Sequence, residues 1–591
     1  MKINLRVNLL YFLLLFTFVG CSSDSDAPDP ENPPVVTPGD EDEEVIPTRS
    51  RIAWDRSSLT KIFSNGNYSR VIEISKDNLV AVAGGPNGVQ FSTSSDRGAT
   101  WSASRIIAAT QKGVITMSVP EILKLKNGNL LLTYNPRPVQ PNDNTNLKYG
   151  IRARISTDNG STWGDEIFVY DAHHLFDNGC WEPCAIQLPS GEIQVYFANE
   201  NDYQTSNEQN ISMCRSVDGG KTWSAREIVS FRSKSRDGMP VALHLPDTKE
   251  IIVAIEDNGY ANHKNRMQPS IIRISEDWAG STVTNTDSRR EYALKEHLLA
   301  TDNGAAPYIC KSSTGEVLLS YQGNQSRDVP LLANGVKSND YTQEMFVAVG
   351  DSRGRSFENT SAPFLLPLGP NPSDNYGYQG VWNSLSSFST GEVFAVTSTN
   401  AFTYPTNAVY GIKGYMLNDI TPSAISATID GKLSECNGKY PSIVVGHSLN
   451  STLYGYVCKS GDNLYLGFKM CGNTNVEHSN TGELKDGFEI ILSSKDGAIK
   501  KTISVPLDGN ITLGRSESLP NEFNSKRASD SSNEVAFECL IPYSYFEKLN
   551  IKNTLAVNVK TFDSVNGKIL TESVANTVES SIDTWLKIFV K

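Results

Sequence analysis

An eight-residue pattern, S-x-D-x-G-x-T-W, constrains the fold of this chain more than any other feature of the sequence. Intact copies are Ser94–Trp101, Ser156–Trp163 and Ser216–Trp223, and Gly350–Phe357 is a degenerate copy. Asp accepts hydrogen bonds from nearby backbone N–H groups, Gly supplies a positive φ, and Trp can pack back onto a sheet. The pattern therefore predicts a tight turn between two β-strands, repeated about every 60 residues.

A second repeat supports the same period. Short turns separate apolar runs at six places: 75–78, 126–129, 189–192, 246–249, 313–316 and 389–392. Each turn follows one predicted strand and precedes another, as Leu130–Tyr134 follows the second turn. Several short strands per unit at this period indicate a β-propeller. We therefore predict an all-β chain with a six-bladed propeller over residues 51–418, and its repeated turns resemble those of sialidase-like propellers.

The C-terminal part of the chain, residues 421–591, has no intact copy of the turn pattern and contains a single Trp, Trp585. Alternating apolar and polar residues recur there, for example in Asn463–Lys469 and Gly487–Leu492. This alternation predicts a β-sandwich domain.

The N-terminus is predicted to lie outside both domains. Residues 1–21 combine a short basic stretch with an apolar run that is too short to span a membrane, followed by Cys21. Phe18–Cys21 resembles a bacterial lipobox, although Phe18 stands where such motifs usually carry Leu. We expect a lipoprotein signal peptide over 1–21, with Cys21 lipidated. Residues 22–50 are rich in Asp, Glu and Pro and predict a disordered linker.

These features predict a lipid-anchored protein of the cell envelope. Cys21 would attach it to outer-membrane lipid, and exposure at the cell surface is an open alternative. The formal net charge of −13 argues against nucleic acid as a partner. No spacing among the other Cys residues or the His residues resembles a metal site, so we expect no metal and no cofactor. We also expect the protein to be a monomer.

The propeller prediction places certain residues at one end of the central axis. The strand before each short turn should be the innermost strand of its blade, so its beginning and the end of the next strand face the same opening. Eight polar or aromatic residues occupy these positions: Arg70, Glu121, Asn135, Glu182, Glu256, Gln322, Trp382 and Asn383.

This set of residues suits a sugar pocket. Aromatic faces stack on sugar rings, and amides and Arg bind hydroxyl groups. Two carboxylates can divide glycoside cleavage, because one protonates the leaving oxygen while the other attacks or activates water. Glu182 and Glu256 come from adjacent blades, and we expect them to be the catalytic pair. The alternative is a structural role, with either Glu paired to Arg70 or to a backbone amide. The residues assigned to substrate binding are Arg70, Glu121, Asn135, Trp181, Gln322, Tyr378, Trp382 and Asn383.

Several short motifs resemble known families. Trp181–Pro183, Arg236–Val241, Ile255–Glu256 and Gly377–Asn383 resemble glycoside hydrolase family 93, and the repeated turns resemble the Asp boxes, or BNR repeats, of the sialidase superfamily. The first resemblance implies an exo-acting, retaining enzyme that releases α-1,5-linked arabinobiose from arabinan. It also implies that Glu182 and Glu256 are the catalytic glutamates, with Glu182 favoured as acid/base and Glu256 as nucleophile.

Three alternatives remain open. The first is an exo-α-sialidase, in which Arg70 would bind the substrate carboxylate, Tyr376 or Tyr378 would be the nucleophile and Arg327 a further Arg. However, the loop 83–90 lacks the Asp that such an enzyme requires. The second is another propeller enzyme, hydrolase or lyase, that acts on polysaccharides. The third is a surface glycan-binding lipoprotein without catalytic activity.

The C-terminal domain also has a resemblance. Four segments resemble carbohydrate-binding module family 9: Ala427–Leu433, Leu464–Phe468, Asp486–Glu489 and Phe537–Pro542. Such modules usually clamp a sugar between two Trp rings, and this domain has no such pair. Tyr440, Tyr454 or Tyr456 could take that place, and packing in the core is the other role for these rings.

Overall fold

The structure is a computed structural model that describes residues 50–590, apart from 260–265, 295–297, 299–301, 326–342, 368–377, 447–450, 473–483, 485, 508, 515, 530–533 and 566–567. The predicted signal peptide, Cys21 and, except for Ser50, the acidic linker lie outside the described residues. Among the residues that are described, no helix is both long and apolar enough to cross a membrane.

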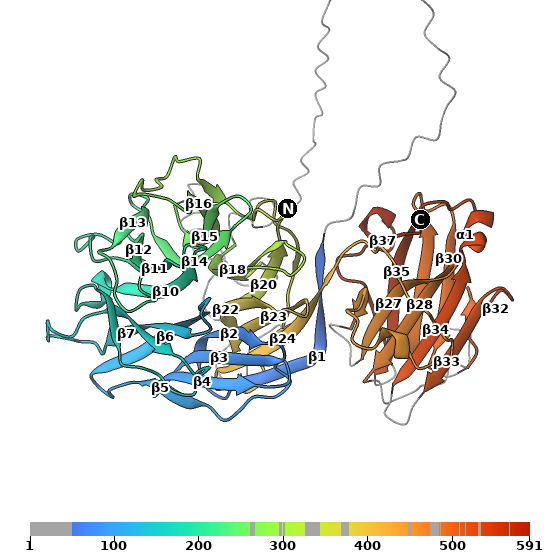
Figure 1. Cartoon of the computed structure of the whole chain (residues 1–591), viewed down its shortest axis with the longest axis horizontal. Helices are drawn as coiled ribbons and strands as arrows, with labels where there is room; N and C mark the ends of the chain where they lie inside the picture. Colours follow the sequence, from blue (N-terminus) through green and yellow to red (C-terminus); the bar gives the residue numbers. More distant parts are fainter. Residues whose placement is uncertain are drawn as a thin grey trace, which may run out of the picture. The chain divides into compact units, whose positions relative to one another are not determined.

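The propeller prediction is confirmed. Within the described part of the chain, six four-stranded antiparallel sheets follow one another, as the blue-to-yellow strands of Figure 1 show. Blade 1 comprises β2 (Asn67–Ser75), β3 (Asn78–Gly85), β4 (Gly88–Ser94) and β5 (Arg105–Ala109). Blade 2 comprises β6 (Ile115–Lys124), β7 (Leu130–Pro138), β8 (Gly150–Ser156) and β9 (Ile167–Asp171). Blade 3 comprises β10 (Cys180–Gln187), β11 (Ile193–Asn199), β12 (Asn210–Ser216) and β13 (Glu227–Ser230). Blades 4 and 5 comprise β14 (Asp237–Leu245), β15 (Glu250–Asp257), β16 (Gln268–Ser275) and β17 (Arg290–Tyr292); and β18 (Gly304–Lys311), β19 (Val317–Gly323), β20 (Glu344–Val349) and β21 (Glu358–Ser361).

Blade 6 closes the ring with strands from both ends of the propeller. Its inner strands are β22 (Gly380–Ser387), β23 (Glu392–Thr399) and β24 (Ala408–Leu417), and its outer strand is β1 (Arg51–Phe63). Arg51 faces Leu417 in an antiparallel ladder, so backbone hydrogen bonds join the first strand to the last. The first strand of each blade contacts the first strand of the next, and β22 contacts β2.

The Asp-box turns connect the third and fourth strands of their blades. In blade 2, Ser156 Oγ donates to Asp158 Oδ1 at 2.8 Å, and the backbone N–H of Thr162 donates to the same carboxylate at 2.8 Å. The Thr162 hydrogen bonds lower the pKa of Asp158 to about 2. Asp96 and Asp218 make the same contacts in blades 1 and 3. The turn prediction is confirmed, and the carboxylates of all three boxes have a structural role.

Two larger sheets follow the propeller. The first contains β25 (Ser423–Ala424), β26 (Ile443–Val445), β27 (Thr452–Ser460), β28 (Asn463–Cys471), β33 (Asn524–Ser529) and β34 (Val535–Pro542). The second contains β29 (Gly487–Ser494), β30 (Lys500–Pro506), β31 (Thr512–Leu513), β32 (Glu517–Ser518), β35 (Thr554–Val565), β36 (Lys568–Ser573) and β37 (Leu586–Phe589). A short helix, α1 (Tyr543–Lys548), follows β34. Phe488 of the second sheet packs against Phe468 and Phe537 of the first, so the two sheets form the predicted sandwich.

The glycine of each Asp box provides a test of this fold. Gly160 has a φ of 87°, and a Cβ added there would lie 2.3 Å from the buried ring of Phe91. We expect Gly160→Ala to lower the free energy of unfolding by about 1–3 kcal/mol from overpacking, beyond the roughly 1–2 kcal/mol cost of the left-handed backbone. Gly128→Ala is the matched control, because Gly128 has a φ of 88° and no atom within 4 Å of the added Cβ. Chemical denaturation measures the free energy of unfolding of both variants. Equal decreases for Gly160→Ala and Gly128→Ala would contradict the close packing of Gly160.

Candidate active site

Each of the six innermost strands is interrupted by a β-bulge near its beginning. In blade 1 the register of the ladder between the first two strands shifts between Asn67 and Arg70. The corresponding ladders of the other five blades shift at the equivalent place. One non-glycine residue in each bulge has a positive φ, between 44° and 54°: Tyr68, Val119, Glu182, Met239, Ala306 and Trp382. A bulge leaves its extra residue out of the ladder and redirects its side chain. The bulges therefore take one side chain per blade out of the regular pattern.

The residue after the bulge position is Pro in four of the six blades: Pro120, Pro183, Pro240 and Pro307. Pro has no N–H to donate, so it suits a position where the ladder is already interrupted. Residues from these bulges, together with Arg70, Glu121 and Asn383, line a small cavity of about 10 Å³. All six blades contribute to this cavity, which therefore lies on the propeller axis. Its volume is about that of one water.

Glu182 stands at this axial cavity beside a guanidinium group. Arg137 Nη2 lies 3.4 Å from Glu182 Oε1. Asn135 Oδ1 accepts a hydrogen bond from Arg137 Nε at 2.7 Å, and the Arg137 guanidinium lies 4.8 Å from the centre of the Trp181 ring. Burial raises the pKa of Glu182 to about 7, an effect that Arg137 opposes and that the charge of Glu256 reinforces. Glu182 is therefore a carboxyl group that exchanges its proton near neutral pH.

Glu256 is the second-last residue of β15 and faces the same opening from blade 4. Its carboxylate Oε2 accepts a hydrogen bond from the backbone N–H of Ala306 in blade 5, at 3.0 Å. Burial raises the pKa of Glu256, and this hydrogen bond and the charge of Arg236 oppose the rise. Gln322 has the equivalent position in blade 5, and its Oε1 accepts from the N–H of Trp382 at 2.8 Å. Glu256 and Gln322 thus each tie one blade to the bulge of the next.

Two bulge residues form an aromatic surface at the junction of blades 1 and 6. The rings of Tyr68 and Trp382 stack with centroids 5.0 Å apart and an angle of 22° between their planes. Both side chains are half-buried. Burial and the charges of Glu182 and Glu256 raise the pKa of Tyr68, so its phenol stays protonated close to both glutamates.

Trp181 and Asn135 lie behind the groups that face the opening. Trp181 is 6% exposed, and its Nε1 donates to Glu200 Oε2 at 3.1 Å while Arg236 forms an ion pair with Glu200. Asn135 is fully buried and donates to the carbonyl oxygen of Cys180 at 3.0 Å. These contacts hold Arg137 and β10 in place. Direct contact of Trp181 and Asn135 with a substrate stays a prediction.

Arg70, Glu121 and Asn383 form the floor of the site. Arg70 Nε donates to Glu121 Oε2 at 2.8 Å, and the guanidinium lies 4.8 Å from the centre of the Tyr308 ring. Tyr308 donates to the other Glu121 oxygen at 3.2 Å. Burial raises the pKa of Glu121, and the charge of Arg70 opposes this rise. Asn383 is 2% exposed and accepts a hydrogen bond from Thr397 at 2.8 Å.

The structure therefore brings the predicted residues of the inner strands to one end of the axis, in an upper ring and a buried floor. Tyr378 lies before β22 and contacts Tyr404 edge to face. Tyr376 and Arg327 lie outside the described residues. Five polar residues of this region were not among the predicted site residues: Tyr68, Arg137, Glu200, Arg236 and Tyr308. Tyr68 could have been found by aligning Tyr68–Arg70 with Val119–Glu121, because both triplets occupy the bulge.

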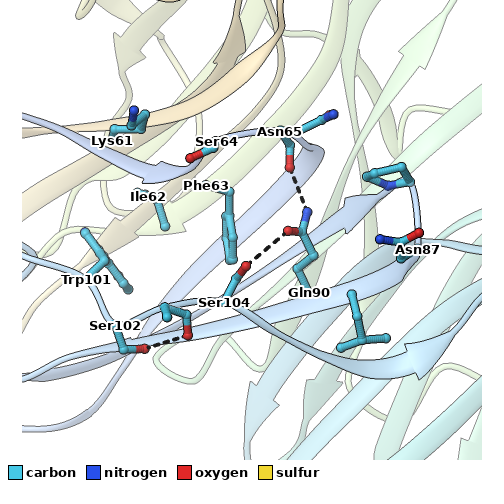
Figure 2. A pocket seen from close by; sticks show the side chains of 13 residues that line it. Lys61, Ile62, Phe63, Ser64, Asn65, Asn87, Gln90, Trp101, Ser102 and Ser104 are labelled. Carbon is cyan, nitrogen blue, oxygen red and sulfur yellow. Dashed lines mark hydrogen bonds between the residues drawn. The ribbon is translucent and has the colours of Figure 1, made fainter.

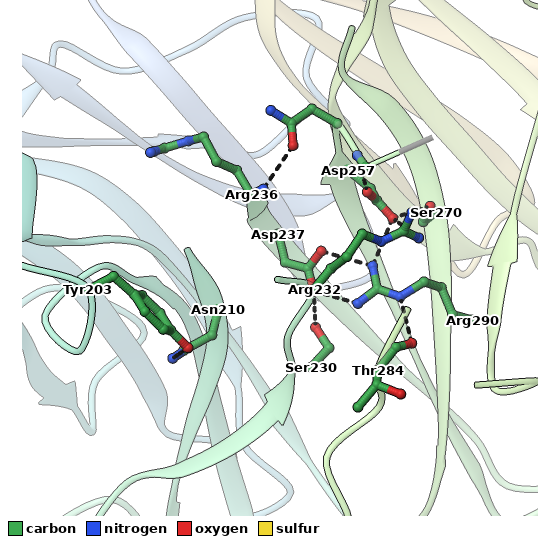
Figure 3. A network of polar contacts seen from close by, with 12 residues as sticks. Tyr203, Asn210, Ser230, Arg232, Arg236, Asp237, Asp257, Ser270, Thr284 and Arg290 are labelled. Carbon is green, nitrogen blue, oxygen red and sulfur yellow. Dashed lines mark hydrogen bonds and ion pairs between the residues drawn. The ribbon is translucent and has the colours of Figure 1, made fainter. Parts of the chain in front are cut away.

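A buried ionic network supports the end of β15 next to Glu256. Arg290 bridges Asp237 and Asp257 with contacts of 2.6 to 2.8 Å, and all three side chains are at most 2% exposed (Figure 3). Asp237 and Asp257 face each other in the β14–β15 ladder, and the next pair is Gly238 and Glu256. Ser230 donates to Asp237 at 2.8 Å and Arg232 lies 3.0 Å from Asp257. The network fixes the backbone that carries Glu256.

The fold and this opening define a class of protein: a six-bladed propeller with Asp-box turns and two glutamates at one end of its axis. The profile of the BNR repeat-like domain matches residues 142–328. A search among curated proteins found no match.

Several solved structures are similar to this one. A protein of unknown function from Dyadobacter fermentans has 14% identity and a TM-score of 0.46, and the match covers 62% of this chain and 99% of that protein. The GH93 α-L-arabinofuranosidase of Fusarium graminearum, solved with arabinobiose, has 16% identity and a TM-score of 0.41 over 60% of this chain and 97% of that one. The microbial sialidase Hz136 has 12% identity and a TM-score of 0.41 over 59% and 65%. The profile match assigns a BNR repeat-like domain to residues 142–328, within the six-bladed propeller that the strands define.

The ionic network of blade 4 can be tested by removing its central cation. Arg290→Met leaves Asp237 and Asp257 buried without their common partner, and loss of one partner from a buried ion pair costs about 3–5 kcal/mol. Arg353→Met is the control, because Arg353 is 51% exposed and its contact with Glu250 is 3.3 Å. A surface pair of this kind contributes about 0–1 kcal/mol. Urea denaturation measures the free energy of unfolding of both variants. A decrease for Arg290→Met as small as that for Arg353→Met would show that the network does not support the blade.

Proposed function

We propose that this protein is an exo-acting, retaining glycoside hydrolase that cleaves arabinan, anchored to the outer membrane through Cys21. Glu182 is the general acid/base and Glu256 is the nucleophile. The aromatic pair of Tyr68 and Trp382 supports a sugar ring next to them. The choice of arabinan rests on the resemblance of Trp181–Pro183 and Gly377–Asn383 to family 93.

One observation carries the proposal. The five positions equivalent to Glu182 hold Tyr68, Val119, Met239, Ala306 and Trp382, so the bulge itself requires no carboxylate. Glu182 nevertheless occupies this position where burial raises its pKa to about 7. A carboxyl group that is costly to ionise and is not required by the fold is a candidate for a functional role.

The electrostatics of the two glutamates favour different tasks. A general acid works best when its pKa lies near the working pH, which fits Glu182. Glu256 accepts the Ala306 N–H, and this bond favours the ionised form that a nucleophile needs. Arg236 also favours the charged form of Glu256. The charge of Glu256 raises the pKa of Glu182, as in other carboxylate pairs that divide acid and nucleophile roles.

The sialidase alternative requires Arg70 to bind a substrate carboxylate. Arg70 is 5% exposed, and its guanidinium is held by Glu121 and by the carbonyl oxygen of Ser69. The burial of Arg70 and its contact with Glu121 favour the hydrolase of a neutral sugar. Product analysis separates the two hypotheses: incubation with linear arabinan should release arabinobiose, and a sialyl-glycoside should release no sialic acid. Free sialic acid would overturn the proposal, and binding without any product would favour the glycan-binding alternative.

Substitution of the glutamates tests their roles. Glu182→Gln should lower kcat about 10²- to 10⁴-fold and leave the melting temperature nearly unchanged, because the amide keeps the shape of the side chain. Glu256→Gln should also abolish turnover, and its amide oxygen can still accept the Ala306 N–H. Glu256→Ala removes that acceptor and should lower the free energy of unfolding by about 1–3 kcal/mol. A stable Glu182→Gln variant with full activity would show that Glu182 is not the acid.

The pKa of Glu182 predicts a pH dependence. The acid must be protonated to act, so kcat/KM should fall as pH rises above about 7, the pKa of Glu182. Arg137 lowers this pKa, so Arg137→Gln should raise it and move the falling limb to higher pH. The pH–rate profiles of both proteins on an arabino-oligosaccharide measure the shift. A limb that stays in place, or moves to lower pH, would contradict the assignment of Glu182.

A further inference from the structure

A larger depression lies away from the axial cavity, at the junction of blades 6 and 1 (Figure 2). Its volume is about 350 Å³, which falls within the range of small-molecule sites. Three segments enclose it: the end of β1 with the residues that follow, the turn between β3 and β4, and the segment from Trp101 into β5. It takes no part in the site described above.

The lining of this depression has the chemistry of a carbohydrate site. The amides of Asn87 and Gln90, the hydroxyls of Ser102 and Ser104 and the half-buried indole of Trp101 line it. Among the described residues that line it there is no Asp or Glu, although the chain carries a formal charge of −13. Amides and hydroxyls can exchange hydrogen bonds with sugar hydroxyls, and an aromatic side chain offers an apolar surface to a sugar ring. The lining also includes Lys61, whose ammonium group can donate to a sugar hydroxyl, so a hydroxyl-rich ligand fits it.

The Gln90 amide in this lining is already oriented. Gln90 Nε2 donates to the backbone carbonyl oxygen of Asn65 at 2.7 Å, and Ser104 Oγ lies 3.4 Å from Gln90 Oε1 (Figure 2). These contacts connect all three segments that enclose the depression. A side chain held in this way loses less conformational freedom on binding than a free one. Gln90 is therefore the residue whose loss should affect binding most directly.

The depression lies at the same blade junction as the aromatic pair of the axial site. Asn65 precedes Tyr68 by three residues, and Trp382 of blade 6 stacks on Tyr68. Asn87 lies in the turn after Gly84, which pairs with Asn67 next to the bulge. One end of the depression therefore reaches the same end of blade 1 as the axial opening. A chain with its terminal sugars at Tyr68 and Trp382 can continue outward across blade 1.

We propose that this depression is a second saccharide-binding site, which holds an internal part of the polysaccharide whose end enters the axial opening. It binds without cleaving, because no carboxylate lines it. The identity of the polysaccharide as arabinan rests on the proposed function. The site increases the affinity for long chains and has no effect on short ones, because both sites then act on one molecule.

The test uses the protein with Glu182→Gln, which keeps the polymer intact. Native gel electrophoresis in linear arabinan should retard this parent. Adding Asn87→Ala and Gln90→Ala should raise the dissociation constant about three- to tenfold, the effect of one or two lost hydrogen bonds. Asn127→Ala is the matched control, because Asn127 is an exposed amide in the β6–β7 turn, outside both sites. Equal retardation of all variants, or no retardation of the parent, would overturn the proposal.

Kinetics on the active protein separate this proposal from the proposed function. The Asn87→Ala/Gln90→Ala variant should raise KM for arabinan and leave kcat and KM for a short arabino-oligosaccharide unchanged. An equal loss on both substrates would show that these residues act at the axial site or on folding, and would overturn the second site. If the wild-type protein cleaves no arabinan but is retarded by it, and the double variant is retarded less, the second site stands while the hydrolase proposal fails.

Discussion

The β-bulge at the start of each inner strand is the constraint on which the axial site depends. A non-glycine residue with a positive φ is strained and persists only where its surroundings fix it. Six such residues, one per blade, have φ values within 10° of one another. The bulge takes one side chain out of the ladder in every blade, and all six blades line the axial cavity. The propeller thus provides six equivalent positions, three of which, Glu182, Met239 and Ala306, line the axial cavity.

The residues two positions after the bulge residues form a layer of paired polar groups between the site and the rest of the axis. Arg70, Glu121 and Tyr308 follow their bulge residues by two positions, and they bond to one another rather than to solvent. An unpaired charge at this depth would be costly, whereas a paired and hydrogen-bonded one is tolerated. The floor therefore fills the axis with satisfied polar groups. Glu182 lies above this floor, and its contact with Arg137 is longer, at 3.4 Å. Burial raises the pKa of Glu182 to about 7, and Arg137 offsets only part of this rise.

Much of this arrangement could be predicted from the sequence, since it follows from local patterns. The Asp boxes and the six short turns identify the blades, and the inner strands then place Glu182, Glu256 and Gln322 at one opening. The pairing of β1 with blade 6 could not be predicted from the repeat, because it joins residues far apart in the chain, such as Arg51 and Leu417, without a motif. Arg137 was missed because β7 runs past Asn135 to Pro138, beyond the apolar run that predicted it. Tyr68 was missed because the bulge in blade 1 lacks the Pro that marks four of the others.

Glu256 shows why a position alone does not define a role. Its neighbour in the pattern, Gln322, makes the same hydrogen bond to the next blade with an amide, so the connection between blades does not need a charge. The other equivalent positions hold Gly84, Asn135, Ala198 and Ser398, which are all neutral. The fold therefore explains why residue 256 is a hydrogen-bond acceptor, but it does not explain why this acceptor is a carboxylate. Burial raises the free energy of that carboxylate, and the ionic network of Asp237, Asp257 and Arg290 holds the adjoining backbone in place. A carboxylate at a position where an amide would satisfy the structure supports the role of nucleophile that we propose for Glu256.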